Sequence, residues 1–325
     1  MPMINLGIIG CAEIAFRRFI PASLQVSELK AVAVAEEYAP DKLEQFEETY
    51  GIEGYNSFDK ILGDPSIDAV YIPQPPALHY KWAKKALEEG KHVLVEKPST
   101  TSYEDTADLV KTAREKGLAL HENYMFAYHL QIEQIKKMLD DKVIGDVRQI
   151  SAQFGFPMRE KNDFRYVKDL GGGALLDAGG YTLKLATILL GDSIKVDSAH
   201  LNYMDGFEVD MYGNVAVSND EGTVCFLGFG MDCGYRCSLE VWGSKGRLYT
   251  NRIFTAPETL EPVVFIETAE GTSEKTLDKD MHFKHSIEKF VSEISSSEER
   301  EKMYDAMLLQ AKLVDEVRAK SEGKI

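Results

Sequence analysis

The chain has 325 residues, a length that predicts two domains rather than a single core. Its 53 acidic and 37 basic residues give a formal net charge of -16, which argues against nucleic acid or an anionic membrane surface as a partner and leaves an anionic small substrate open. The four cysteines match no zinc spacing, no apolar run approaches the about 18 residues of a membrane span, and no charged-then-apolar leader opens the chain, so we expect a cytoplasmic protein without a metal site.

The first 123 residues alternate strand-like and helix-like segments. Buried strands are predicted at residues 3–10, 30–35, 68–72, 92–95 and 118–122. Helices are predicted between them at residues 11–24, 41–50, 57–62, 78–89 and 102–116, several of them closed by a glycine. This spacing predicts an α/β domain over residues 1–123, with a parallel sheet covered on both faces.

The turn after the first strand has the pattern of a dinucleotide-binding site. It reads Gly10-x-Ala12-x-x-Ala15, with alanine at two places where glycine is usual. Such a turn must be tight and must let a pyrophosphate approach the backbone at the helix N-terminus. The strand before it and the helix after it favour a cofactor site over a plain turn. The candidate cofactor residues here are Gly7, Gly10, Cys11, Ala12, Glu13 and Ile14.

Two acidic residues, Glu36 and Glu37, end the second strand. A carboxylate at this place can accept hydrogen bonds from the adenine-ribose hydroxyls of NAD and would repel the 2′-phosphate of NADP. No arginine occurs between Lys30 and Gly51 to attract that phosphate. The sequence therefore favours NAD, with NADP still open.

The stretch Glu96-Lys97-Pro98 follows an apolar strand directly. It therefore lies at the carboxyl edge of the sheet, where open α/β folds bind ligands, and a lysine there can be held near a cofactor and a carbonyl at once. Taken alone, such a pair is more often a solvated strand end. The cofactor edge after the strand at 68–72 would be lined by Pro73, Gln74, Pro75 and His79.

After Glu122 the pattern changes to that of an α+β domain, over residues 124–325. Helices are predicted at 131–139 and 174–190, an open antiparallel strand at 147–156, and a loop at 162–170. Several strands separated by turn signals follow over residues 195–276, and helices at 283–294 and 304–319 end the chain. We expect an open, mostly antiparallel sheet, and a cleft between the two domains with Lys97 on its rim.

The predicted helix at 174–190 carries Asp177 and Tyr181, which share a face if the helix is regular. The glycines between them would let another backbone or a ligand come close. Tyr181 could exchange a proton if a cation favours its ionised form, and Lys97 is the candidate cation. Alternatively, Tyr181 is an amphipathic tyrosine on a buried helix and Asp177 a local cap.

The Gly10 turn, Glu96-Lys97-Pro98 and Asp177-x-Gly179-x-Tyr181 occur together in this order. The combination resembles the glucose-fructose oxidoreductase, inositol dehydrogenase and MocA (Gfo/Idh/MocA) family. The resemblance implies a Rossmann domain, then an open-faced sheet domain, with nicotinamide in the cleft and Lys97 near the reacting carbon.

The family usually has histidine at the position of Tyr181. Tyrosine there is similar to a smaller branch of dihydrodiol dehydrogenases, some pentose dehydrogenases, and ketoreductases acting on nucleotide-linked deoxysugars. Members of the last group commonly use NADPH. Four stretches resemble that group: residues 10–18, 122–126, 171–177 and 251–257.

The expected reaction is reversible hydride transfer between nicotinamide and a hydroxyl or carbonyl carbon of a sugar or sugar derivative. Tyr181 would donate the proton, and Lys97 would polarise the carbonyl. Glu96 would position Lys97 and approach the nicotinamide ribose, so Glu96 and Lys97 are also expected to bind the cofactor. The residues expected to hold substrate are Asn123, Arg165, Asp177 and Tyr181.

Three functions compete at this point. The first is an oxidoreductase on a free sugar or polyol. The second is a ketoreductase on a sugar nucleotide, whose pyrophosphate would need basic groups such as Arg165, Arg159 and Arg252. The third is a non-catalytic nucleotide sensor, which the presence of both Lys97 and Tyr181 disfavours.

The strands of the second domain are rich in large apolar residues, and some of them must face helices while others are free to form a subunit interface. These residues are Phe226, Leu227, Phe229, Tyr235, Leu239, Val241 and Trp242. We therefore expect a homo-dimer or homo-tetramer assembled through the C-terminal sheet.

Overall fold

The computed structural model describes residues 2–323. The chain divides into two compact units, the first formed by Met1–Asn123 with Phe283–Leu308 and the second by Tyr124–His282 with Leu309–Ile325. The expected domain boundary after residue 123 coincides with the first division. Residues 283–308, which the sequence assigned to the second domain, belong to the first unit.

The first unit contains a six-stranded sheet in the order β3-β2-β1-β4-β5-β6, with every neighbouring pair parallel. Its strands are β1 (Ile4–Ile9), β2 (Leu29–Ala35), β3 (Glu53–Tyr55), β4 (Ala69–Ile72), β5 (His92–Glu96) and β6 (Leu120–Asn123). The parallel α/β sheet expected from the sequence is confirmed. The sequence missed β3, because a three-residue edge strand is too short to show a periodic pattern.

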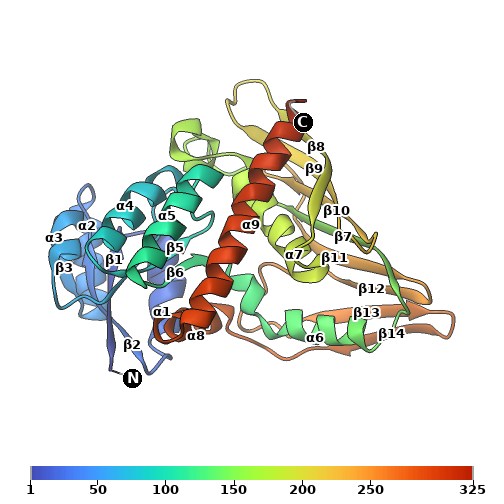
Figure 1. The fold of residues 1–325 in the computed structure, drawn as a ribbon, viewed down its shortest axis with the longest axis horizontal. Helices are drawn as coiled ribbons and strands as arrows, with labels where there is room; N and C mark the ends of the chain where they lie inside the picture. The colour runs from blue at the N-terminus through green and yellow to red at the C-terminus, as the bar shows by residue number, and fades with distance from the viewer. Residues whose placement is uncertain (1, 324–325) are drawn as a thin grey trace. The chain divides into compact units, whose positions relative to one another are not determined.

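Helices connect these strands, and α4 and α5 lie side by side against the sheet (Figure 1). The helices are α2 (Pro40–Tyr50), α3 (Phe58–Gly63), α4 (Pro76–Glu88), α5 (Tyr103–Lys116) and α8 (His282–Ser295), together with α1 (Ile20–Ser23), which continues a π-helical turn η1 (Ala15–Phe19). Helix α5 has a side-chain N-cap, since the Ser102 hydroxyl accepts from the Asp105 N–H at 3.2 Å. The last helix, α9 (Ser297–Ser321), begins in the first unit and ends in the second.

The order of the strands reverses at β1, which lies between β2 and β4. Open α/β sheets bind ligands outside the carboxyl ends of the strands at such a point. The Gly10 turn follows β1, Pro73 follows β4, and Lys97 follows β5. The fold of the first unit thus brings three predicted cofactor segments to one edge of the sheet.

The second unit contains an eight-stranded sheet in the order β14-β13-β12-β11-β7-β10-β9-β8. Its strands are β7 (Val147–Gly155), β8 (Lys195–Tyr203), β9 (Asp210–Ser218), β10 (Val224–Gly230), β11 (Arg236–Gly243), β12 (Gly246–Thr250), β13 (Val263–Thr268) and β14 (Gly271–Thr276). All neighbouring pairs are antiparallel except β7 with β10, which are parallel. The expectation of a mostly antiparallel sheet is confirmed, whereas β7 is antiparallel only toward β11.

The helical segments of the second unit differ from the prediction in two places. They are η2 (Met125–Tyr128), α6 (Leu130–Asp140), η3 (Phe164–Tyr166), η4 (Lys168–Leu170), η5 (Leu175–Gly179) and α7 (Gly180–Leu190). The predicted loop at 162–170 contains the two short 3-10 helices η3 and η4. The predicted regular helix at 174–190 begins with the π-helical turn η5.

The sheet of the second unit has one covered and one exposed face, as its alternating side chains show. Leu227, Leu239 and Val241 are buried, and α7 contacts this sheet at β7 and β10. Phe226 and Trp242 are 47% and 58% exposed on the alternate positions. The structure thus assigns these apolar residues to two different faces of the sheet, a division that the sequence analysis had left open.

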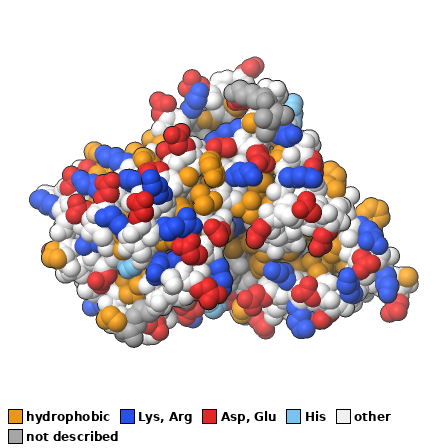
Figure 2. All heavy atoms as spheres, in the orientation of Figure 1, with side chains coloured by type: hydrophobic (Ala, Val, Ile, Leu, Met, Phe, Trp, Pro, Cys, Tyr) orange, Lys and Arg blue, Asp and Glu red, His pale blue; other side chains and the backbone are white. Residues whose placement is uncertain are grey.

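Charged side chains of both signs are interspersed over the helices of the first unit on the face shown in Figure 2. Within residues 2–323, no helix combines the length and the apolar character needed to cross a membrane.

Candidate functional site

The turn after β1 is tight and leads into a helix. Gly10 has a φ of +106°, a conformation that favours glycine, and a Cβ on it would collide with Nε2 of Gln74. That Nε2 donates to the Ile9 carbonyl at 2.9 Å, so Gln74 holds the turn closed from the β4 side. The chain then enters a helix at Glu13, and the first N–H groups of a helix have no partner within the helix itself.

Glu36 and Glu37, adjacent in the sequence, have different environments. The carboxylate of Glu36 accepts from the Cys11 N–H at 3.0 Å and from the Tyr38 N–H at 2.9 Å, so it lies at the dinucleotide turn. Glu37 accepts from the Phe58 N–H at 2.8 Å at the start of α3. Burial and the Glu36 carboxylate raise the pKa of the Cys11 thiol to about 12, so this thiol stays protonated at neutral pH.

His79 joins two loops at the same edge of the sheet. Its Nδ1 lies 2.8 Å from the Pro98 carbonyl and its Nε2 lies 2.6 Å from the Gln74 carbonyl. The ring is fully buried, and burial lowers its pKa to about 4 although the two carbonyls act in the opposite direction. The structure therefore places His79 as a support between the loop of Pro73, Gln74 and Pro75 and the segment after Lys97.

Glu96, the last residue of β5, is held by two hydrogen bonds. Its Oε1 accepts from the Tyr71 hydroxyl at 2.6 Å and from Nδ2 of Asn123 at 2.7 Å. Burial raises the pKa of Glu96, and both hydrogen bonds oppose that rise. The Tyr71 ring is stacked on Phe19 with centroids 3.7 Å apart, which links Glu96 to the helix of the dinucleotide turn.

Lys97 is half-buried directly after β5 and precedes a cis peptide bond to Pro98. The backbone beyond it is anchored, because the Ser99 N–H donates to Oε1 of the buried Glu122 at 2.8 Å. The lysine is therefore presented from a strand end whose neighbours on both sides are fixed by side chains of β6.

Tyr181 lies in the second unit, within a cluster of aromatic rings. Its ring centroid is 5.0 Å from that of Phe154, 5.5 Å from Tyr124 and Phe126, and 5.9 Å from Phe254. Its hydroxyl lies 3.7 Å from the Met125 sulfur. These rings hold the phenol in one orientation in a largely apolar setting.

The glycines near Tyr181 make room for protein side chains. A Cβ on Gly180 would collide with the Tyr124 hydroxyl, and a Cβ on Gly179 would lie 3.1 Å from the Phe229 ring. Gln310 of α9 donates to the Gly180 carbonyl at 2.9 Å. The close approach expected at these glycines is therefore an approach of aromatic rings.

Asp177 is part of a half-buried cluster of charges. Its Oδ2 accepts from Nε of Arg165 at 2.8 Å, and NH1 of Arg165 donates to Asp163 at 3.1 Å. The guanidinium also lies over the Phe164 ring, 4.6 Å from its centroid. The structure brings the predicted substrate residues Arg165 and Asp177 together, with Asp163 as a third member that the sequence did not single out.

Asn123 has a different place from the one predicted. Its amide donates to Glu96, and its Oδ1 accepts from the Ser286 hydroxyl at 2.7 Å. Both ends of this buried amide are thus bound within the first unit, so it supports Glu96 where a substrate contact was expected. Sequence reasoning missed Ser286, which lies on a helix 163 residues further along the chain.

Several other predicted residues have plain structural roles. Gly7 is buried in β1, where a Cβ would lie 2.8 Å from Cδ1 of Ile61, so this glycine permits helix packing. Glu13 is exposed and forms an ion pair with Arg17. Within residues 2–323, no group of three or more His, Cys, Asp or Glu side chains could hold a metal ion.

Two family models match the chain. Residues 4–124 match the oxidoreductase family with an NAD-binding Rossmann fold, and residues 132–249 match the GFO/IDH/MocA C-terminal domain. Together these matches cover most of both units.

Characterised relatives match over nearly the whole length. The chain is 40% identical over 315 residues to the dTDP-3,4-didehydro-2,6-dideoxy-alpha-D-glucose 3-reductase of Actinomadura kijaniata, covering 97% of this chain and 95% of that protein. It is 39% identical over 291 residues to the enzyme of that name from Saccharopolyspora spinosa, covering 90% and 87%.

A solved structure is also similar, that of a 3-ketoreductase from Actinomadura kijaniata in complex with NADP and TDP-benzene. Its TM-score is 0.94 with 39% identity, covering 98% of both chains. The chain therefore belongs to the Gfo/Idh/MocA family and is an NAD(P)-dependent oxidoreductase that transfers hydride between nicotinamide and a hydroxyl or carbonyl carbon of a sugar or sugar derivative.

Proposed function

We propose that the protein is a 3-ketoreductase acting on a dTDP-linked deoxysugar. The observation that carries this proposal is the 40% identity to a dTDP-sugar 3-reductase over 97% of the chain. The presence of Tyr181 at a position where the wider family usually has histidine supports the same branch. A free sugar or polyol as substrate is the competing proposal.

In the proposed reaction, the bound nicotinamide supplies the hydride to the keto carbon. Tyr181 donates a proton from its hydroxyl to the substrate oxygen as that oxygen gains negative charge. Lys97 stabilises the same charge as a cation, and Glu96 holds the strand end that presents the lysine. The half-buried pair of Arg165 and Asp177 hydrogen-bonds substrate hydroxyls.

The pyrophosphate of a nucleotide sugar needs basic partners. Arg165 is already paired with Asp163 and Asp177, which leaves Arg252 and Arg159 as the stronger candidates. NH1 of Arg252 donates to the Tyr235 hydroxyl at 2.7 Å, and the guanidinium of Arg159 lies 5.2 Å from the Phe156 ring centroid. Both cations are thus positioned beside aromatic rings.

A spectrophotometric screen tests the substrate. The protein is incubated with NADPH or NADH and 3-keto forms of dTDP-linked deoxysugars, free sugars or polyols, and the reverse oxidations are run with NADP and NAD. Turnover of the dTDP-linked substrate with at least about 100-fold higher kcat/KM than its free sugar supports the proposal, because a bound pyrophosphate contributes several charge-assisted hydrogen bonds. Preference for the free sugar overturns it, and cofactor binding without any turnover would favour a sensor.

The choice of cofactor is a separate prediction. We propose that Glu36 favours NAD, because its carboxylate lies at the turn and would repel a 2′-phosphate. The similar solved structure contains NADP, so tighter binding of NADPH is the competing outcome. The wild-type preference is measured by fluorescence titration with NADH and NADPH.

The variant Glu36→Gln should lower the ratio of the NADPH dissociation constant to the NADH dissociation constant by about tenfold, since it removes one charge near the phosphate. The ratio cancels any general damage to the turn. Glu37→Gln is the matched control, because Glu37 caps α3, and its ratio should stay at the wild-type value. Equal ratios in Glu36→Gln and the wild type would show that Glu36 does not select the cofactor.

The exposed aromatic residues of the second unit carry a prediction about assembly. We propose a homo-dimer or homo-tetramer through the face bearing Phe226 and Trp242, since exposed apolar patches of this kind are rare on monomers. Size-exclusion chromatography with light scattering should return a multiple of 36.4 kDa, and Trp242→Glu should shift the mass toward one chain. A wild-type mass of one chain contradicts the proposal.

The cytoplasmic location likewise stays a prediction of the sequence.

A further inference from the structure

A continuous chain of buried hydrogen bonds runs from Glu96 into the interior of the first unit. Its members are Asn123 and His121 on β6, and Ser286 and Glu293 on α8, each at most 1% exposed. Nδ2 of Asn123 donates to Glu96 at 2.7 Å, and the Ser286 hydroxyl donates to Oδ1 of Asn123 at 2.7 Å. Nε2 of His121 lies 3.1 Å from the Ser286 oxygen, and its Nδ1 lies 3.0 Å from Glu293.

Secondary structure aligns these four side chains. His121 and Asn123 are two apart on a strand and so lie on the same side of it, while Ser286 and Glu293 are seven apart on a helix and share a face. Phe290, between them on α8, lies against the His121 ring with centroids 6.1 Å apart. The contact of β6 with α8 thus combines this ring contact with one row of polar groups.

The direction of each hydrogen bond follows from its neighbour. A carboxylate only accepts, so the Asn123 amide presents its nitrogen to Glu96 and its oxygen to Ser286. Ser286 has one proton and gives it to that oxygen, so it must accept from Nε2–H of His121. Nδ1 of His121 faces the Glu293 carboxylate on the other side of the ring. The three hydrogen bonds that link His121, Ser286, Asn123 and Glu96 therefore all point toward Glu96.

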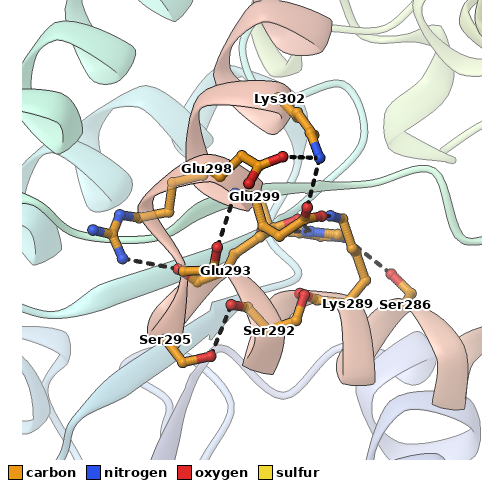
Figure 3. A network of polar contacts seen from close by, with 11 residues as sticks. Ser286, Lys289, Ser292, Glu293, Ser295, Glu298, Glu299 and Lys302 are labelled. Atoms are coloured by element: carbon orange, nitrogen blue, oxygen red, sulfur yellow. Dashed lines mark hydrogen bonds and ion pairs between the residues drawn. The ribbon is translucent and has the colours of Figure 1, made fainter.

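Glu293 is itself held at the other end by charged groups where α8 meets α9. Nζ of Lys289 lies 3.9 Å from Oε1 of Glu293, and Arg300 donates to the Glu293 carbonyl at 3.0 Å. Lys289 also pairs with Glu299, which accepts from Lys302 at 2.8 Å (Figure 3). The row is thus anchored in a surface network whose members all come from α8 and α9.

We propose that Ser286, His121 and Glu293 are positioning residues for the reaction, because they orient Asn123 and, through it, the Glu96 carboxylate beside Lys97. This inference rests on the proposed function, in which Glu96 and Lys97 serve the cofactor and substrate. This chain of hydrogen bonds positions groups and does not conduct protons, since the Asn123 amide within it does not exchange protons readily. Burying four polar groups is costly unless every group is hydrogen-bonded. Loss of one hydrogen bond should therefore make the neighbouring side chains rearrange and change the position of the Glu96 carboxylate.

The first test compares two serines on α8. Ser286→Ala removes the donor to Asn123 and should lower kcat about tenfold and weaken NADPH binding about fivefold, because a buried amide oxygen is left without its partner. Ser292→Ala is the matched control, since the Ser292 hydroxyl donates only to the Lys289 carbonyl of its own helix, at 2.6 Å. It should change neither value more than about twofold. Equal kcat and equal NADPH affinity in the two variants would overturn the proposal.

The second test separates the two sides of His121. In His121→Gln the amide nitrogen takes the place of Nε2 and keeps the bond to Ser286, whereas in His121→Asn it takes the place of Nδ1 and keeps the bond to Glu293. The proposal expects His121→Gln to retain kcat within about threefold and His121→Asn to resemble Ser286→Ala. A purely structural role predicts equal losses in both, which contradicts the proposal. Melting temperatures are recorded so that all assays are run well below the least stable variant's transition.

The substrate screen and these variants test two separate claims. If the wild type reduces no substrate, the proposed function is wrong. The NADPH affinity of the same four variants still decides whether the chain of hydrogen bonds positions Glu96. If the wild type is active but the variants do not separate as described, only the positioning role is wrong.

Discussion

Replacing Lys97 with alanine is expected to lower kcat by about three orders of magnitude while leaving cofactor affinity within about fivefold. In the proposed reaction, Lys97 supplies the positive charge beside the reacting oxygen, and the substitution removes that charge. Binding of the dinucleotide depends on the Gly10 turn and the Glu36 carboxylate, which the substitution leaves unchanged. The measurement is steady-state turnover of the substrate found by the screen, with NADH or NADPH fluorescence titration for binding.

Two variants control for this result. Lys97→Arg keeps the charge with a different shape and should retain more turnover than Lys97→Ala. Lys111→Ala removes an exposed lysine of α5 in the same unit and should leave kcat unchanged. If Lys97→Ala turns over at a rate close to that of Lys111→Ala, Lys97 has no part in the chemistry.

Replacing Tyr181 with phenylalanine is expected to lower kcat by about 100-fold, since it removes the proposed proton donor. The ring remains among Phe126, Phe154 and Phe254, so the free energy of unfolding should change by no more than about 1 kcal/mol. Kinetic and thermal-denaturation measurements on the same preparation separate the two effects.

Tyr124→Phe is the matched control for Tyr181→Phe. Tyr124 belongs to the same aromatic cluster, and its hydroxyl lies 3.4 Å from Nε2 of Gln310. Its loss should cost stability and leave kcat within about threefold. A rate for Tyr181→Phe as high as that of Tyr124→Phe would show that Tyr181 only packs against substrate and that the proton comes from elsewhere.

Local patterns were sufficient to predict the elements that surround the site. The parallel strands, the glycine turn and the strand end at Lys97 follow from apolar runs and from residues that stop them, and these are properties of a few neighbouring residues. The same reasoning treated Glu36 and Glu37 alike, although consecutive residues at a strand end point to opposite sides. Only the position of α3 shows that Glu37 caps a helix and Glu36 faces the turn.

The sequence patterns did not predict the irregular helical turns. The apolar run at 174–190 predicts one regular helix, whereas the π-helical turn at Leu175–Gly179 places Asp177 outside its register with Tyr181. Contacts from distant parts of the chain set this turn, including the Asp210 carboxylate, which accepts from the Leu175 N–H at 2.6 Å.

The sequence by itself determined the family, the Rossmann-type first domain, the open sheet of the second, and Lys97 and Tyr181 as the residues to test. Only the tertiary structure shows which side chains hold Glu96. One of them is Asn123, which the sequence analysis expected to bind substrate. The tertiary structure also returned α8 to the first unit and so supplied Ser286 and Glu293. The physical reason is that periodicity shows which face of an element is buried, while the partner of that face depends on how distant segments meet.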